Sequence, residues 1–202
     1  MVPTFVEGRT RWKRFVGVLA VSLVVAGLLL FGLANGAIAA SFAESGSSFK
    51  TSASQLRGSG FAQFGSVDRG AGGAHPVART IIGSASMDNF CQSAVVPALP
   101  LVGDISLVIR AAGRDSVQAS NLVADLSNLT GKVSFQNIVI GLDASQLNGG
   151  APGLAGSPGS FGQQADRIVV DGLRQMAQRV TASTLTLNGL DFTVTAGRSE
   201  CF

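Results

Sequence analysis

The sequence predicts a mainly β protein, an antiparallel β-sandwich-like domain preceded by one N-terminal transmembrane or signal helix. Short runs in the C-terminal part place apolar side chains at alternate positions, and turn residues separate these runs, as is typical of half-buried strands. The clearest runs are residues 104–110, 132–141, 166–173 and 183–195. A short β-solenoid is the alternative, because V-V-D-G-L and T-L-N-G-L look like one unit used twice.

The N-terminal region consists of a basic segment followed by an apolar one. Residues 1–14 contain four of the fifteen Lys and Arg residues, and the positive-inside rule places such a segment in the cytoplasm. Residues 15–39 are almost entirely apolar, and about twenty such residues in a helix span the roughly 30 Å of a bilayer's hydrocarbon layer. A retained membrane anchor and a cleaved signal peptide both fit this pattern. Ala37 and Ala39 supply the small residues of a cleavage site before Ala40.

Residues 40–202 are expected to form one extracytoplasmic domain. The chain would be a single-pass protein of the cell membrane with this domain outside, or a secreted protein if it is cut near Ala39. The domain carries eleven Lys and Arg against eleven Asp and Glu. Such a neutral body offers no basic surface for phosphate backbones, so the sequence excludes nucleic acid as a partner.

The aromatic side chains of this domain are all Phe. The chain contains no Tyr, and its single Trp is Trp12 in the basic segment. Tyr and Trp are enriched in protein interfaces because they combine an apolar face with a polar group. The Phe residues after residue 40 are therefore predicted to lie in the core.

The domain contains two cysteines, Cys91 and Cys201. Outside the cytoplasm an even pair favours a disulfide, with two buried thiols as the alternative. Such a bridge would close a loop of about 110 residues, worth roughly 4–5 kcal/mol in the chain-entropy model. Two sulfurs and a single histidine are too few ligands for a closed tetrahedral metal site, so no metal and no cofactor is predicted.

Two dipeptides and one helical stripe mark the C-terminal third. Asn188-Gly189 lies between runs that keep period two, which is the strongest short hairpin signal, and Asp171-Gly172 repeats it. Leu173, Met176, Ala177 and Val180 recur at helical spacing. The segment 171–181 is therefore predicted as a short amphipathic helix within the otherwise β-rich domain.

Two glycine-rich stretches are predicted as loops. Residues 148–162 contain six glycines and two prolines, and such a Gly/Pro-rich stretch cannot hold a regular ladder, so it is interpreted as a flexible connector. It lacks the spacing and the Lys of a phosphate-binding loop. Residues 65–76 are predicted as a second polar loop.

The only weak candidate for a catalytic residue is His75, which lies in this second loop. Acyl-transfer hydrolases need a nucleophile, a base that takes its proton, and donors for the oxyanion. Any Ser-His-Asp arrangement must use His75, because it is the only histidine. The G-x-S-x-G motif of many esterases does not occur, and the sequence therefore predicts no catalytic residue beyond this candidate.

Several sequence blocks together resemble a known family. They are G-R-T-R-W-K-R-F at 8–15, F-A-Q-F-G-S-V-D at 61–68, A-H-P-V-A at 74–78, N-F-C-Q-S at 89–93, F-G-Q-Q-A-D at 161–166 and the final E-C-F. With them the chain resembles an uncharacterised family of actinobacterial membrane-associated proteins over nearly its whole length. The resemblance implies a single-pass or signal-bearing envelope protein, a small multi-pass membrane protein as partner, and pairing of Cys91 with Cys201. Members sometimes carry the label cholesterol esterase, for which His75 would be the residue concerned.

These observations favour a non-enzymatic protein of the cell envelope. We expect its β domain to bind a membrane partner or an apolar ligand such as a lipid. This binding would take place next to the cytoplasmic membrane. A lipid or sterol ester hydrolase that uses His75 is one alternative, and a purely structural surface component is another. The identity of the ligand does not follow from the sequence.

Overall fold

The computed structural model describes residues 48–70, 73–99, 103–151 and 153–202, together with four residues near the N-terminus. The chain divides into two compact units, Met1–Glu44 and Ser45–Phe202. In the first unit, Trp12, Phe15, Gly17 and Leu19 have a helical conformation.

The predicted transmembrane or signal segment falls on the first unit. Apart from the four helical positions, residues 1–39 and the cleavage-site residues Ala37, Ala39 and Ala40 lie outside the described residues. In the part of the chain that the structure does describe, there is no helix with the length and apolar character needed to cross a membrane.

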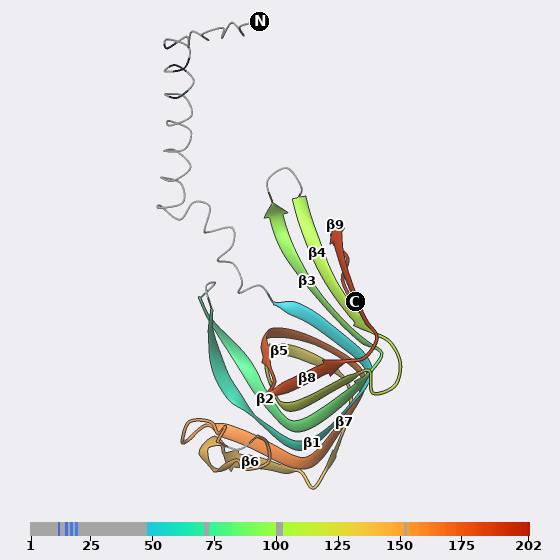
Figure 1. Ribbon diagram of the computed structural model, residues 1–202. Coiled ribbons are helices and arrows are strands. Elements are labelled where there is room, and N and C mark those ends of the chain that lie inside the picture. The colour runs from blue at the N-terminus through green and yellow to red at the C-terminus, as the bar shows by residue number, and fades with distance from the viewer. Residues whose placement is uncertain are drawn as a thin grey trace, which may run out of the picture. The chain divides into compact units, whose positions relative to one another are not determined.

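The second unit is built almost entirely from β-strands (Figure 1). Within its described residues the strands are β1 (Phe49–Gly70), β2 (Gly73–Asp88), β3 (Phe90–Leu99), β4 (Gly103–Ala111), β5 (Val117–Gln136), β6 (Val139–Asp143), β7 (Phe161–Thr181), β8 (Thr184–Leu187) and β9 (Leu190–Ala196). One turn of 3₁₀-helix, η1 (Ala144–Gln146), follows β6. The prediction of a mainly β fold is confirmed.

Four long strands pair in a closed circuit. Strand β1 pairs with β2, β2 with β5, β5 with β7, and β7 again with β1, each time antiparallel. We call these four strands the closed sheet. Strands β3, β4 and β9 continue from β1 as a three-stranded extension, which we call the arm, while β6 and β8 pair with β7 and β5. Figure 1 shows the arm projecting beyond the curved strands of the closed sheet.

This topology makes the predicted architecture more specific. All nine described strands belong to one hydrogen-bonded sheet, so the antiparallel pairing is confirmed, but two separate sheets do not face each other as in a sandwich. The solenoid alternative is wrong for the described strands, because the rungs of a β-solenoid pair in parallel whereas every pairing here is antiparallel.

The strands of the closed sheet bend where three residues without bulky side chains lie side by side. Gly60, Gly83 and Asn121 occupy neighbouring positions on β1, β2 and β5. Gly60 has φ +66° and Asn121 has φ +49°, in the left-handed region that Gly and Asn tolerate best. A Cβ on Gly83 would come within 3.2 Å of the Ser59 carbonyl oxygen. These positions allow long strands to curve enough to close on themselves.

The predicted helix over 171–181 is wrong, since this segment lies inside β7. A local irregularity at Gly172, with φ +63°, changes which side chains point inward. Ile168 and Val170 are buried before it, and Leu173 and Gln175 after it. The alternation therefore skips one residue, so that the apolar positions imitate the spacing of a helix. The hairpin predicted at Asp171-Gly172 is wrong for the same reason.

The turn predicted at Asn188-Gly189 is present, but it does not join a hairpin. Gly189 has φ +66°, as a tight turn requires. The strand before it, β8, pairs with β5, and the strand after it, β9, pairs with β4. This turn therefore carries the chain from the closed sheet to the arm.

The two predicted loops have different outcomes. Most of 65–76 belongs to the hairpin of β1 and β2, in which Gly70 lies opposite Gly73, so the broad loop prediction is wrong. The described residues between 148 and 160 contain no strand, and β7 begins at Phe161.

The segment 148–160 packs closely on the closed sheet. A Cβ on Gly150 would lie 2.7 Å from an Ile81 side-chain atom, and a Cβ on Gly156 would lie 2.5 Å from the Cβ of Ala144. The glycines of this segment allow close packing, in contrast to the loose connector that we expected.

The C-terminal residues cross the arm and are fixed by a disulfide between Cys91 and Cys201, whose Cα atoms lie 5.9 Å apart. The Cys201 amide donates to Ser93 Oγ at 3.0 Å, and the Ser199 amide donates to Ser106 Oγ at 2.8 Å. The predicted disulfide is thus present in the structure, and it holds the end of the chain on β3 and β4.

Candidate ligand cavity

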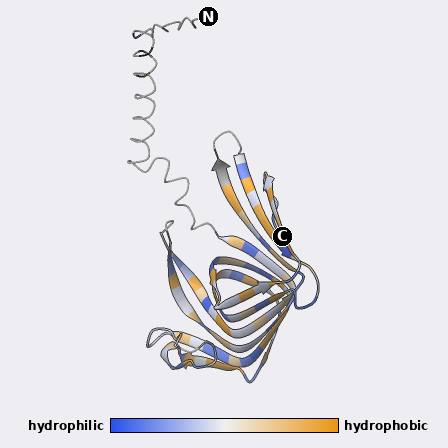
Figure 2. Ribbon diagram, viewed as in Figure 1, coloured by the Kyte–Doolittle hydropathy of each residue, from blue (hydrophilic) through white to orange (hydrophobic). Residues whose placement is uncertain are grey.

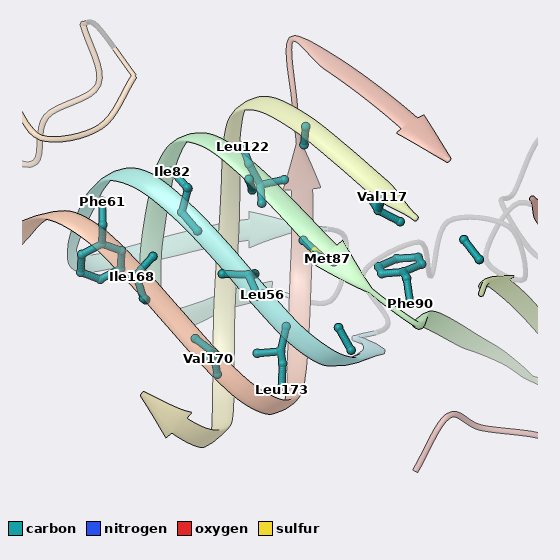
Figure 3. Close-up of a cluster of buried hydrophobic side chains, with 14 of the residues drawn as sticks. Leu56, Phe61, Ile82, Met87, Phe90, Val117, Leu122, Ile168, Val170 and Leu173 are labelled. Carbon is teal, nitrogen blue, oxygen red and sulfur yellow. The ribbon is translucent and has the colours of Figure 1, made fainter. Parts of the chain in front are cut away.

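The inner face of the closed sheet forms the main hydrophobic core. Leu56, Phe61, Ile82, Leu122 and Leu173 are all at most 6% exposed, and they come from all four long strands. Figure 3 shows side chains of β1, β2, β5 and β7 pointing toward one another inside the circuit. The alternation of apolar and polar residues along each strand directs these side chains inward.

This core is not completely filled. Its side chains line a cavity of about 250 Å³. Its lining is mostly aliphatic and aromatic, and Phe61 and Phe135 form one wall with their ring centroids 5.2 Å apart. The volume exceeds the roughly 150 Å³ of an apolar cavity known to hold benzene, and it is near the lower limit of ordinary ligand pockets.

Three uncharged polar side chains line the cavity, namely Gln63, Thr80 and Gln175. Gln63 Nε2 donates to Thr80 Oγ1 at 2.8 Å, and Gln163 Nε2 donates to Gln63 Oε1 at 2.7 Å. Gln63 and Thr80 lie opposite each other in the pairing of β1 with β2, and their side chains are hydrogen-bonded to each other. None of the described lining residues carries a charge.

A second, larger hollow is an open groove of about 720 Å³. Serine, threonine and glutamine from β1, β2, β5 and β8 provide most of its lining, together with Arg57 and Arg167. Ser59 Oγ and Ser84 Oγ lie 2.6 Å apart, as do Ser120 Oγ and Thr184 Oγ1. These hydroxyls already hydrogen-bond to one another. The smaller cavity is better suited to a specific ligand, because it is less open than the groove and its lining is mostly apolar.

Arg57, at one end of this groove, is held by two carboxylates. Its guanidinium contacts Asp88 in a bidentate arrangement at 2.9 and 2.6 Å, and Asp115 at 2.6 Å. The Arg57 side chain also donates to Gln55 Oε1. The hydrogen bonds from Arg57 and from the Asp115 amide lower the pKa of Asp88 to about 2, and the bond from Arg57 lowers the pKa of Asp115. Asp88 and Asp115 in turn raise the pKa of Arg57. This cluster joins the end of β2 to the β4–β5 loop, so its role is structural.

A second set of charges has members on all four strands of the closed sheet, and Asp125 lies on β5 between the cavity-lining residues Ala124 and Leu126. Arg79 Nε donates to Asp125 Oδ1 at 2.7 Å, and Arg179 Nη2 lies 3.0 Å from Asp68 Oδ1. Asp125 is opposite Arg79 on one side and opposite Arg179 on the other. The hydrogen bond to Asp125 raises the pKa of Arg79. Both carboxylates are buried, and their pairing with arginines satisfies them.

The structure places His75 in β2, directly opposite Asp68 in β1. Asp68, however, is paired with Arg179. Within the described residues the His75 side chain makes no hydrogen bond, and an activated nucleophile would require one from a hydroxyl or thiol to the imidazole. The described residues also contain no group of three His, Cys, Asp or Glu side chains that could hold a metal ion.

The cavity and its polar lining were not predicted from the sequence. Gln175 is preceded on β7 by the irregularity at Gly172, which moves it from the expected solvent side to the inner face. Leu173, Gln175 and Ala177 keep period two and are all buried. This alternation indicates a strand with the three side chains on one face. The helix predicted over the same residues led to a different assignment.

The fold and the cavity define this domain as an antiparallel β protein whose single sheet closes around a small apolar chamber. Residues 45–202 match the model of a family of unknown function, DUF6230, and the chain therefore belongs to that family. The search of curated proteins and the search of solved structures each return no match to the chain.

Proposed function

We propose that this domain is a non-enzymatic binding protein for a small apolar molecule, which it takes up inside the closed sheet. The observation that carries this proposal is the uncharged, mostly apolar cavity of about 250 Å³ between the four strands of the closed sheet. Protein interiors are normally packed to the density of organic crystals, and an unfilled apolar space of this size reduces stability. A ligand that fills this space recovers the lost contacts.

Naphthalene is a suitable probe, because it is apolar, uncharged and fluorescent. We expect it to bind the purified chain and to raise its melting temperature. Replacing Ala124, a small residue of the cavity wall that is 5% exposed, by Phe fills part of the space and is expected to weaken binding at least about tenfold, or about 1.4 kcal/mol.

The matched control is Ala74→Phe, which makes the same change at an exposed position on β2 and should leave binding unchanged. If Ala124→Phe prevents folding, Leu129→Phe provides a second cavity-wall variant. Absence of naphthalene binding to the unmodified chain would contradict the proposal, and so would cavity-wall variants that bind naphthalene as tightly as the unmodified chain does.

The proposal places the domain in the cell envelope, outside the cytoplasm, where residues 15–39 attach it to the membrane or direct its export. The disulfide between Cys91 and Cys201 supports this location, because such bridges persist in oxidising compartments. An integral multi-pass protein is the proposed membrane partner. Mass spectrometry of the protein from its native cells separates the two forms. A mature N-terminus at Ala40 means release, one at Met1 or Val2 means attachment, and a reduced protein in the cytosol contradicts the location.

A further inference from the structure

Strand β9 is an unprotected edge of the sheet. Three of the described strands pair on one side only, namely β6, β8 and β9, and β9 is the longest of them with seven residues. Figure 1 shows it as the outer strand of the arm. Natural edge strands are usually guarded against pairing with another chain by Lys, Pro, a bulge or a covering segment. The sequence of β9, L-D-F-T-V-T-A, contains neither Lys nor Pro, and its register with β4 is regular.

The backbone groups of alternate residues on β9 point away from β4. The Gly197 amide donates to the Asp104 carbonyl at 2.7 Å, and this pair continues the register of the two strands. Along an antiparallel pair, residues that exchange hydrogen bonds with the neighbouring strand alternate with residues that do not. The residues of β9 that do not bond to β4 are therefore Leu190, Phe192, Val194 and Ala196. Their N–H and C=O groups point out of the sheet edge, and no described strand pairs with them.

Three of these outward-facing residues also have exposed apolar side chains. Leu190 is 56% exposed, and Phe192 and Val194 are each 54% exposed. The C-terminal segment covers the other face of the arm, because it contacts Ser106, whose partner on β9 is Thr195. Apolar side chains beside unpaired backbone groups form the kind of edge to which a further strand adds.

The strand that fits this edge best is a second copy of β9. Two β9 strands can pair antiparallel about a two-fold axis that passes beside Thr193. Phe192 then lies opposite the partner's Val194. Leu190 lies opposite the partner's Ala196. All four outward-facing residues of each copy therefore find a backbone partner, and the apolar side chains meet in cross-strand pairs.

The charge on β9 agrees with this register. Asp191 is the only charged residue of the strand, and it lies opposite the partner's Thr195. A shift by two residues in either direction leaves one outward-facing residue of each copy unpaired. A shift by four residues toward the start of the strand places Asp191 opposite the partner's Asp191, and like charges in that position are destabilising. The symmetric register about Thr193 is therefore the favoured one.

We infer that β9 is a self-association surface, through which two copies of this chain form a two-fold symmetric dimer and join their arms into one continuous sheet. Such an interface is isologous, because the same residues contribute from both copies. The backbone of β9 supplies the hydrogen bonds, and its exposed apolar side chains lose contact with water. The interface does not use the cavity, so it is independent of the proposed function.

Cross-linking through an introduced cysteine tests the register. Thr193 lies next to its own counterpart in a pair without mutual hydrogen bonds, where the Cα atoms are about 4.5 Å apart, within the range that a disulfide spans. The full chain with Thr193→Cys should therefore form a disulfide-linked dimer, seen on a non-reducing gel at twice the mass of the chain. The matched control is Asp191→Cys, whose counterpart lies at least about 13 Å away, and its cross-linked fraction should be at least about tenfold smaller.

Val194→Pro tests the edge without disturbing the pairing of β9 with β4. The Val194 N–H points outward, so proline removes a donor to the partner copy and none to β4. In the Thr193→Cys chain it should lower the cross-linked fraction about tenfold or more. The disulfide between Cys91 and Cys201, mapped by mass spectrometry, shows that the arm is intact in each variant. If Thr193→Cys disturbs this disulfide, sedimentation of the unmodified chain and of Val194→Pro at about 0.1 mM provides the second measurement, with a dimer expected for the first and a monomer for the second.

The expected result is efficient cross-linking of Thr193→Cys that Val194→Pro abolishes. Equal cross-linking of Thr193→Cys and Asp191→Cys would overturn the inference, because the chains would then meet at random or in another register. It is also overturned if Thr193→Cys stays monomeric with the arm intact, or if the dimer persists with Val194→Pro.

Discussion

The closed sheet and the arm are both apolar and both antiparallel, but they use their apolar side chains differently. In the closed sheet these side chains point into a common interior, so that Phe61 is 2% exposed. In the arm, Phe192 and Val194 on the edge strand β9 are each 54% exposed. Figure 2 shows hydrophobic positions along the strands of both regions. Apolar alternation alone therefore does not distinguish a strand that encloses a core from one that presents an open face.

The difference between the two regions is one of closure. Four strands that pair in a circuit bury one face completely, whereas three strands in a row bury only what another segment covers. In the arm the cover on one face is the C-terminal segment, through the disulfide at Cys91 and the hydrogen bonds to Ser93 and Ser106. The closed sheet is thus expected to be stable through its core, and the arm through its cross-link.

The largest expected effect compares the same substitution in the two regions. Phe61→Ala removes a buried ring and enlarges the cavity, which should cost about 4 kcal/mol of unfolding free energy. Phe192→Ala removes a half-exposed ring from the arm and should cost less than about 1 kcal/mol. Denaturant unfolding of both variants measures the difference. Equal losses would show that the arm buries its apolar face as fully as the closed sheet does.

An intermediate effect is expected from the disulfide. Cys91 and Cys201 are separated by 110 positions in the sequence, and replacing both by Ser should cost about 3 kcal/mol, because measured losses are usually smaller than the chain-entropy figure of roughly 4–5 kcal/mol. Hydrogen exchange should show that amides of β3, β4 and β9 lose protection first, while those of β5 and β7 retain it. Uniform loss of protection over all these strands would mean that the two regions unfold as one unit.

The smallest effect concerns the charged cluster where β2 ends and the arm begins. The pKa of Asp88 is lowered to about 2 from an ordinary 3.8, so its contribution is complete above about pH 4 and is lost as the pH falls through about 2. Asp88→Asn should cost about 1–2 kcal/mol at neutral pH, and this cost should shrink on acidification.

Asp191→Asn, at an exposed position in the arm, is the control for Asp88→Asn and should change stability little at any pH. If the loss of unfolding free energy caused by Asp88→Asn stays constant from pH 7 to pH 2, then the charge of the carboxylate does not stabilise the contact with Arg57.

The sequence contained enough information for the fold class and the cross-link, but not for the closure. Alternating runs predicted strands, and two cysteines in a chain that was expected to be exported predicted a disulfide, because both inferences depend on local pattern or on simple pairing. The circuit of β1, β2, β5 and β7 depends on contacts between residues far apart in the chain. The prediction that the Phe residues lie in the core is confirmed for Phe61 and wrong for Phe192. The sequence does not show which of the two strands belongs to the closed circuit.

The local irregularity at Gly172 had the greatest effect on the prediction of the site. A helical stripe and an interrupted strand place apolar residues at similar intervals, and only the pairing with β1 and β5 decides between them. The inward direction of Gln175 follows from that pairing. The sequence pointed to His75 instead, because a single histidine is conspicuous while a glutamine in a strand is not.

The account is tested most directly by methyl NMR of the full chain during titration with naphthalene. It predicts that methyl resonances of Leu56, Leu122 and Leu173 inside the closed sheet shift in a saturable manner, while those of Leu190 and Val194 in the arm remain in place. Shifts confined to Leu190 and Val194, with the interior methyls unchanged, would contradict it, since the ligand would then adsorb to an open face and not enter the cavity.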